Sequence, residues 1–270
     1  MLERPALSHL ALVGLAGLAL IAGLALLTWL ASLRRRDASL ADRAWPAFIG
    51  GAALVYAALL PASGVRSFAM VLLAVAWALR LGIYITRRNR GHGEDRRYQQ
   101  MRERNQPHFG LKSLYLVFGL QSVLGWIVTA PLLAGLAGAR PFGWLDAAGA
   151  LLAAFGIVFE AIADAQMARF KSHPAQRGRL MDRGLWHYSR HPNYFGEACV
   201  WWGLCLMAVS ASGWAGAWSV VSPALMTLLL LRVSGVGLLE KDIGERRPAY
   251  RNYIARTNAF FPGPPRKDPA

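Results

Sequence analysis

Charged residues are scarce in this chain of 270 residues, and acidic residues are the scarcer kind. Charged side chains make up 17% of the sequence, with 15 acidic against 30 basic residues, while hydrophobic residues make up 55%. Apolar runs of roughly 20 residues recur between the charges, and this is the length of helix that crosses a ~30 Å hydrocarbon core. So little charge excludes an ordinary soluble protein. We predict an all-α, polytopic helix bundle embedded in a lipid bilayer.

Cysteine is rare as well. The two cysteines, Cys199 and Cys205, fall six positions apart within one apolar run, which is neither metal-binding nor redox spacing. His173, His187 and His191 lack the helical spacing of a metal site, so we predict no metal. A Gly-x-Ser-x-Gly motif is also missing, which removes the usual sign of a serine hydrolase.

Seven apolar runs are predicted to be transmembrane helices. The first is too long for a secretory signal and ends in three arginines, so we expect it to be retained. We treat residues 1–270 as one membrane domain, with a signature region at 184–262 and a frayed, proline-rich tail at Phe261–Ala270. The seven expected spans are Leu7–Leu33, Ala44–Leu60, Ser67–Thr86, Ser113–Leu136, Trp144–Ala163, Gly196–Val209 and Ala215–Val236.

The basic residues predict the orientation. The loops after the odd-numbered spans, with the C-terminal tail, hold 26 Lys and Arg residues, and the opposite side holds three. This asymmetry predicts an outside N-terminus and a cytoplasmic C-terminus. Because the basic residues flank the apolar runs, we expect no nucleic-acid partner despite the net charge of +15. The high content of Ala, Leu, Gly and Arg is typical of a GC-rich bacterial genome, so we expect a bacterial inner membrane.

The run Gly184–Gly203 concentrates polar side chains where a polar loop meets an apolar helix. Arg190, His191 and Tyr194 fall close together, and Glu197 lies in the first turn of the expected helix. An acid carried into a membrane span is costly and usually marks a functional site. The cluster therefore predicts a membrane enzyme with a bound cofactor.

One face of that helix carries an amide, an acid and an indole. Asn193, Glu197 and Trp201 follow one another at intervals of four residues, and together they suit the polar rim and ring of a cofactor. Each also has a structural explanation, because Asn193 can cap the helix, Glu197 favours its positive end, and Trp201 suits a membrane interface.

Two more acids lie near the end of the fifth expected span. Glu160 and Asp164 are four residues apart, so their carboxylates share one helix face. They predict a wet cavity or a cationic partner, and the alternative is an interfacial pair with Arg169. The following loop is rich in bases that suit phosphate or anionic lipid. These bases are Arg169, Lys171, Arg177, Arg179, Arg183 and Arg190.

Taken together, these features resemble the steroid 5-alpha-reductase family in its C-terminal domain. The similarity is closest to the bacterial branch described as a domain of unknown function (DUF1295). It covers most of the chain and is strongest in Trp77–Gln100, Gly184–Gly203 and Leu239–Pro262. The resemblance implies an NADPH-dependent reductase that acts on a carbon–carbon double bond conjugated to a carbonyl, in a lipophilic substrate. It also implies a cofactor held inside the helix bundle.

The resemblance assigns roles to particular residues. It implies that Asn89, Asp164, Asn193 and Glu197 line the cofactor, and we group Arg90, Arg190, His191, Tyr194 and Trp201 with them as cofactor-binding residues. The family's acid is a tyrosine on the third helix, assisted by a glutamate on the second.

The chain departs from that pattern of acids. Trp77 or Ala78 occupies the tyrosine position, and no glutamate occurs in Ala44–Leu60. Tyr84, or Arg80 as a polarising group, is therefore the predicted catalytic residue, with Tyr56 as a further available phenol.

A methyltransferase is the alternative. The isoprenylcysteine carboxyl and phospholipid methyltransferases share the run Arg190–Gly196 and a C-terminal acid followed by tyrosines, here Glu240 and Tyr250 to Tyr253. That resemblance implies S-adenosylmethionine as the cofactor. Asn193, Glu197 and the Trp-Trp-Gly ending of the run favour the reductase.

Overall fold

The structure is a computed structural model that describes residues 7–61, 64–176, 178–233, 235–240 and 249–266. These residues form helices and connecting loops, and the described ranges contain no β-strand. The chain divides into two compact units. The first comprises Met1–Ala150 with Leu204–Ser222, and the second comprises Leu151–Gly203 with Pro223–Ala270. We describe each unit separately.

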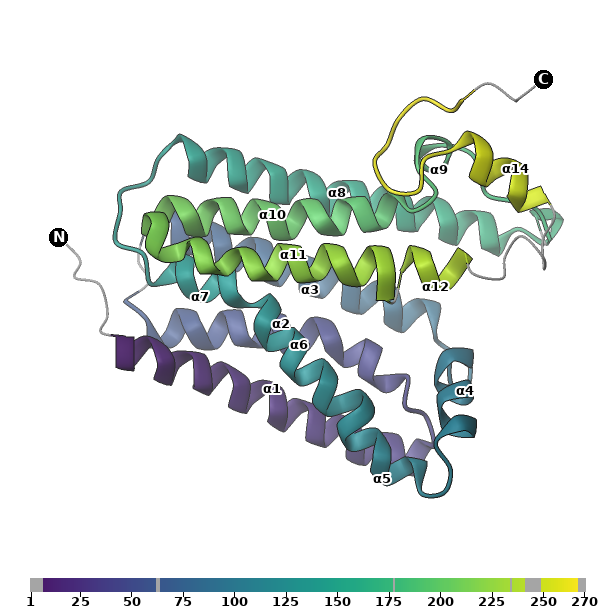
Figure 1. Ribbon diagram of the computed structural model, residues 1–270, viewed down its shortest axis with the longest axis horizontal. Helices are drawn as coiled ribbons and strands as arrows, with labels where there is room; N and C mark the ends of the chain where they lie inside the picture. Colours follow the sequence, from purple (N-terminus) through teal and green to yellow (C-terminus); the bar gives the residue numbers. More distant parts are fainter. Residues whose placement is uncertain (1–6, 62–63, 177, 234, 241–248, 267–270) are drawn as a thin grey trace. The chain divides into compact units, whose positions relative to one another are not determined.

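Long helices and a broken helical segment form the first unit (Figure 1). α1 (Leu7–Arg35), α2 (Leu40–Leu59) and α3 (Val65–Arg88) pack in chain order, and α4 (Arg96–Arg104) follows as a short polar helix. A continuous helical segment then comprises α5 (Phe109–Ser113), a π-helical stretch at 114–119, α6 (Leu120–Val128) and α7 (Ala130–Leu136). This segment packs on α1 and α2.

The second unit is built mainly on α8 (Trp144–Ser172) and α10 (Pro192–Ser212), with the one-turn helix α9 (Leu185–Tyr188) between them in sequence. It also contains most of α11 (Val221–Leu228), a π-helical stretch at 229–233, α12 (Val236–Glu240) and α14 (Ala249–Arg256). The boundaries between the units fall inside α8, α10 and α11 rather than in linkers.

Among the described residues, five helical segments are long and apolar enough to cross a membrane, which makes the chain an integral membrane protein. They are Leu7–Arg35, Val65–Arg88, Phe109–Leu136, Trp144–Ser172 and Pro192–Val233. The second of the seven expected spans, Ala44–Leu60, is helical as far as Leu59, where α2 ends, but is not one of the five. The sixth expected span and most of the seventh fall within the last segment.

That last segment folds back on itself. It has 42 residues, which as a straight helix would extend about 63 Å, twice the thickness of a hydrocarbon core. α10 ends at Ser212, Gly213 adopts a φ of 61°, and a 3₁₀ stretch leads into α11. In the second unit the Trp202 indole then donates to Thr227 Oγ1 at 3.3 Å, so α11 returns alongside α10.

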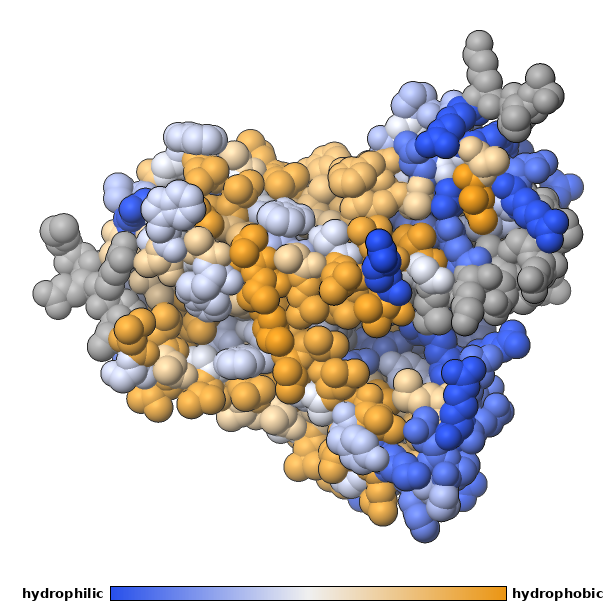
Figure 2. All heavy atoms as spheres, viewed as in Figure 1, coloured by the Kyte–Doolittle hydropathy of each residue, from blue (hydrophilic) through white to orange (hydrophobic). Residues whose placement is uncertain are grey.

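Apolar side chains cover the outside of the first unit's helices. Leu12, Phe68 and Leu79 are each at least 60% exposed, and Figure 2 shows hydrophobic residues spread over these helices. In water such a surface would be unusual for a monomer. In a bilayer the same surface contacts lipid tails.

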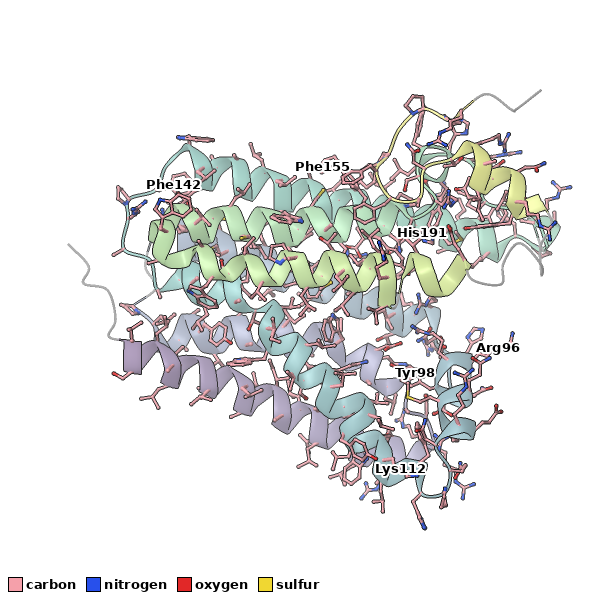
Figure 3. The ribbon with its side chains drawn as sticks, viewed as in Figure 1. Arg96, Tyr98, Lys112, Phe142, Phe155 and His191 are labelled. Carbon is pink, nitrogen blue, oxygen red and sulfur yellow. The ribbon has the colours of Figure 1, made fainter. Side chains whose placement is uncertain are left out.

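The short helix α4 is polar, in contrast to the apolar outside of the long helices. Asp95 caps it by accepting from the backbone N–H of Arg97 at 2.9 Å. Tyr98 turns inward and donates to Asp42 on α2 at 2.6 Å, whereas Arg96 points away (Figure 3). Burial raises the pKa of the Tyr98 phenol, and the charge of Asp42 raises it further, so the group remains a donor. This hydrogen bond ties α4 to the bundle.

A buried ion pair connects other elements of the first unit. Arg66 at the start of α3 forms a bidentate pair with Asp146 in the first turn of α8, with N–O distances of 2.5 and 2.7 Å. Asp146 is fully buried and also accepts from Ser210 on α10 and from the backbone N–H of Gly143. Arg66 also donates to the carbonyls of Arg140 and Pro141. Because both charges are paired and further hydrogen-bonded, the pair fixes the ends of three helices.

The described part of the C-terminal tail is held in place. Gly263 N–H donates to the carbonyl of Tyr188 at 3.0 Å, and Arg266 N–H donates to that of Arg256 at 2.8 Å. The frayed tail expected at Phe261–Ala270 thus begins with hydrogen-bonded residues, and 267–270 lie outside the described residues.

Candidate functional site

The loop before α10 is fixed to α8 by its first residues. Gly184 has a φ of 61°, and a Cβ there would lie 2.6 Å from the side-chain oxygen of Gln166, so both its backbone and its surroundings favour glycine. The same Gln166 oxygen accepts from the N–H of Leu185 at 2.9 Å. The buried indole of Trp186 donates to the carbonyl of Ala163 at 3.0 Å. α9 is therefore anchored to the last third of α8.

Arg190 is the centre of the cluster that follows. Its Nε and Nη2 donate to the two carboxylate oxygens of Glu240 at 2.7 and 2.8 Å, a bidentate pair. Its Nη1 donates to the carbonyls of Ile254 and Thr257 on and after α14. A guanidinium has five N–H groups, so these contacts leave one for any other partner.

His191 shares the same carboxylate. Its Nε2 lies 3.0 Å from Glu240 Oε1, and its ring stacks on Tyr194 with the centroids 5.2 Å apart. Burial alone would raise the pKa of Glu240. The hydrogen bonds from His191 and Arg190 and the positive charge of Arg190 outweigh burial and hold that pKa at about 2. Glu240 is thus ionised at neutral pH and pairs with both residues of the Arg-His motif.

A strap of C-terminal residues, Asn258–Gly263, covers this loop. Arg190 N–H donates to the carbonyl of Asn258 at 2.9 Å, and Ser189 Oγ donates to that of Phe260 at 2.9 Å. Tyr253 on α14 donates its hydroxyl to the carbonyl of Trp186. Burial raises the pKa of Tyr253, which keeps its phenol protonated. The strap and α14 therefore form a continuous hydrogen-bonded cover over residues 186–190.

α8 and α10 approach one another closely just beyond the loop. A Cβ on Gly156 would lie 2.5 Å from the carbonyl oxygen of Gly196, so only glycine permits this contact. Glu160 lies one turn further along α8, and a Cβ on Gly196 would be 2.9 Å from its Cβ. Phe159 packs edge-on against Phe195, with centroids 5.6 Å apart. The crossing therefore brings the backbones of α8 and α10 into contact beside Glu160.

Three acids are buried around that crossing: Glu160 and Asp164 on α8, and Glu197 on α10. Trp201, one turn along α10, is fully buried and donates its indole N–H to Glu197 at 2.8 Å. The predicted sharing of a helix face by residues 197 and 201 is thus confirmed. Within the described ranges, no three His, Cys, Asp or Glu side chains come together in a way that would hold a metal ion.

The side-chain oxygen of Asn193 is buried and accepts no hydrogen bond within the described residues. It lies in the first turn of α10, four residues before Glu197, and its Oδ1 has no hydrogen-bond partner among the described residues. Burying an amide oxygen without a donor is costly. From the sequence, Asn193 could cap the helix or contact a cofactor. The unsatisfied oxygen favours a ligand that brings an N–H or O–H group.

The dinucleotide expected from the sequence would meet these residues through its polar groups. The Asn193 oxygen suits the amide N–H of a nicotinamide or a ribose hydroxyl, and the Glu197 carboxylate suits further hydroxyl groups. Arg190 has only one N–H left for a phosphate. Three arginines of the same unit are exposed, and their guanidinium groups therefore suit a phosphate better: Arg169, Arg179 and Arg183. Arg177 lies outside the described residues.

The other predicted residues lie on the first unit. Arg80 and Tyr84 are on α3, and the Tyr84 ring lies 5.5 Å from the Arg88 guanidinium carbon, a cation–π contact. Asn89 terminates α3; its side chain accepts from Arg88 at 3.2 Å and its carbonyl from Arg43 at 3.3 Å. Arg90 is exposed in the turn that follows.

The partners of the Arg-His motif were not predicted from the sequence. Glu240 was noted only for its similarity to a methyltransferase, and Tyr253 only as part of a tyrosine-rich segment. The available signal was the position of Glu240, the first acid after the apolar run that ends the last expected span. Its pairing with residues about 50 positions earlier is a tertiary contact that no local pattern reveals.

The fold and the polar cluster define a helical integral membrane protein with a buried polar site. Over residues 28–257 the sequence matches the family described as "Protein of unknown function (DUF1295)". The chain therefore belongs to the DUF1295 family. It is also similar to an uncharacterized protein of Schizosaccharomyces pombe, at 28% identity over 261 residues, which covers 87% of this chain and 75% of that protein. No solved structure matches the chain significantly.

Proposed function

We propose that this protein is a membrane-embedded reductase that uses NADPH to reduce a carbon–carbon double bond conjugated to a carbonyl in a lipophilic substrate. The observation that supports it most directly is the buried, unsatisfied Asn193 oxygen beside the Glu197–Trp201 pair. The enone type of substrate rests on the resemblance to the steroid 5-alpha-reductases. Apolar access to such a substrate is consistent with a site on spanning helices.

Each of the site residues in the second unit has a defined part in this proposal. Asn193 accepts a hydrogen bond from the ligand, and Trp201 orients Glu197 through its indole N–H. The apolar side chains of the helices exclude water, which strengthens these polar contacts. NADPH, when bound, supplies the hydride. Arg190 holds the loop before α10 rather than the phosphates, because four of its hydrogen bonds are already made within the protein.

The proton donor stays a sequence prediction. We assign it to Tyr84, with Arg80 as the group that would polarise a carbonyl oxygen. We also propose that the chain crosses the membrane seven times, with α2 as the second crossing and two crossings within Pro192–Val233. The N-terminus would be outside and the C-terminus in the cytoplasm, in a bacterial inner membrane.

A methyltransferase that uses S-adenosylmethionine is the second candidate. The observation that favours it is the burial of three carboxylates, Glu160, Asp164 and Glu197, in one unit. Buried acids suit a cationic ligand such as a sulfonium better than the anionic phosphates of NADPH.

Calorimetric titration of the purified protein in detergent with NADPH and with S-adenosylmethionine separates the two candidates. We expect heat of binding with NADPH and none with S-adenosylmethionine. Binding of S-adenosylmethionine alone would overturn the reductase proposal.

Two substitutions test the site within that experiment. Asn193→Ala and Glu197→Gln should each weaken NADPH binding by roughly tenfold or more, because each removes a buried polar contact. Matched controls are Asn252→Ala on the exposed face of α14 and Asp182→Asn, whose carboxylate is 38% exposed. The controls should bind as the wild type does. Equal affinity in all four variants would return Asn193 and Glu197 to structural roles.

A further inference from the structure

Glu240 occupies an unusual position in the second unit. It ends α12, yet its carboxylate contacts both members of the Arg190–His191 motif, at 2.7, 2.8 and 3.0 Å. All three side chains are at most 13% exposed. A buried carboxylate shared by two basic residues is strongly held, because removing it would leave a buried guanidinium without its counter-charge.

The motif stands directly before α10. His191 precedes the first residue of that helix by one position, and its backbone N–H is in turn held by Ser189 Oγ at 3.2 Å. The His191 ring also stacks on Tyr194, in the first turn of α10. The direction in which α10 leaves the loop is therefore fixed by residues that Glu240 holds.

The unsatisfied amide of Asn193 lies two residues beyond His191. Its Oδ1 can meet a ligand only if the first turn of α10 stays in place. Glu197 and Trp201 continue from the same turn. Contacts thus run from the Glu240 carboxylate through His191 to Tyr194, which follows Asn193 directly in the first turn of α10.

We propose that Glu240 is a positioning residue for the cofactor site: its carboxylate holds Arg190 and His191, and so sets the first turn of α10 that carries Asn193. It does not touch the ligand in this proposal. The effect of Glu240 on cofactor affinity rests on the proposed function. Its effect on the first turn of α10 does not.

Arg190 makes this arrangement depend on α14 as well. While two of its nitrogens bind Glu240, the third donates to the carbonyls of Ile254 and Thr257. Replacing the carboxylate by an amide removes the charge that orients the guanidinium of Arg190. The hydrogen bonds from this guanidinium to the α14 region are then held less firmly. We therefore expect the effect of a substitution at Glu240 to extend to both α10 and α14.

The test uses Glu240→Gln, Glu240→Asp and the control Asp182→Asn, which alters a half-exposed acid that pairs with Arg256 at 3.7 Å. The first readout is the dissociation constant for NADPH. The second is the rate at which a water-soluble maleimide labels Cys199, a buried residue of α10, in a Cys205→Ser background. The labelling rate reports on the first turns of α10 without any cofactor.

Glu240→Gln should weaken NADPH binding and accelerate labelling of Cys199, each by about tenfold or more. Glu240→Asp keeps the charge but draws it back by about 1.5 Å, so it should fall between the wild type and Glu240→Gln in both readouts. Asp182→Asn should match the wild type. Should Glu240→Gln not fold, Glu240→Asp is compared with the wild type alone, and labelling several times faster supports the proposal.

The outcomes separate the two proposals. Accelerated labelling without any NADPH binding in the wild type would overturn the reductase function but leave Glu240 as a positioning residue. Normal labelling and normal NADPH binding in Glu240→Gln would overturn the positioning role and leave the reductase function intact. A labelling rate equal to that of the wild type in both Glu240 variants overturns the inference in every case.

Discussion

Gly156 and Gly196 bring two helices of the second unit into backbone contact. A methyl group on Gly196 would lie 2.8 Å from the carbonyl oxygen of Gly156, and one on Gly156 would lie 2.5 Å from the carbonyl oxygen of Gly196. Small residues at helix crossings allow such close packing in membranes. Because Glu160 lies one turn from Gly156 and Glu197 follows Gly196, this contact also sets the spacing of two buried acids.

Gly196→Ala should therefore destabilise the protein by about 1–3 kcal/mol, since backbone atoms rather than flexible side chains must move. Thermal unfolding in detergent measures the change. Gly23→Ala on α1 is the matched control, because nothing lies within 4 Å of its added methyl group. An alanine inside a helix is favoured over glycine, so the control should be neutral or slightly stabilising. Equal effects of the two variants would contradict the importance of the crossing.

The buried pair of Arg66 and Asp146 leads to a second prediction. Asp146→Asn should cost about 3–5 kcal/mol, because it leaves the Arg66 guanidinium buried without its counter-charge. The comparison is Asp182→Asn at the exposed pair with Arg256, where the loss should stay below about 1 kcal/mol. Thermal unfolding of both variants in detergent decides, and similar midpoints would show that the buried pair contributes little.

Stability should fall in acid through Glu240. Its pKa in the folded protein, about 2, lies below the ordinary value of 4.5, so its contribution is present above about pH 4.5 and is lost as the pH falls toward 2. The loss amounts to a few kcal/mol at most. Unfolding midpoints measured from about pH 6 down to about pH 3 should drop for the wild type. In Glu240→Gln the drop should be smaller, and identical pH profiles would contradict this assignment.

Tyr98 should control the attachment of α4. Tyr98→Phe removes the hydrogen bond to Asp42 and leaves that carboxylate with fewer donors, at a cost of about 1 kcal/mol. Hydrogen exchange of the α4 amides should become faster, while the amides of α8 stay unchanged. Tyr115→Phe is a suitable control because Tyr115 is 62% exposed.

The proposed topology is tested by reporter fusions. A reporter joined after Ala270 should indicate the cytoplasm, and one placed in the loop between α7 and α8 should indicate the outside. A periplasmic signal from the C-terminal fusion would contradict the count of seven crossings. Because α2 is not apolar enough to be one of the five candidate spans, the loop between α1 and α2 is the informative third position.

The helices were largely predictable from the sequence. The expected span Leu7–Leu33 is α1, and Trp144–Ala163 lies within α8, because long apolar runs specify helix length directly. The expected span Ala215–Val236 was less accurate. Gly213 turns with a positive φ and residues 213–220 form a 3₁₀ stretch, so α11 starts at Val221.

The site was predictable only in part. Spacing alone placed Glu197 and Trp201 on one face, and the structure confirms their contact. The same reasoning assigned Arg190 to a cofactor, and no local pattern could show that its guanidinium is occupied by Glu240 and two carbonyls. Two residues about 50 positions apart, such as Arg190 and Glu240, meet only because of the way the chain folds back. Composition and periodicity do not indicate this path.

The hydrogen bonds from Arg190 to the carbonyls of Ile254 and Thr257 set an order of events during biosynthesis. Along the chain, these acceptors come after all five candidate spans found among the described residues. The ribosome therefore makes the groups that close the loop ahead of α10 only after it has made the last of these spans. A chain that stopped translation before residue 254 would contain all five candidate spans but could not complete this loop.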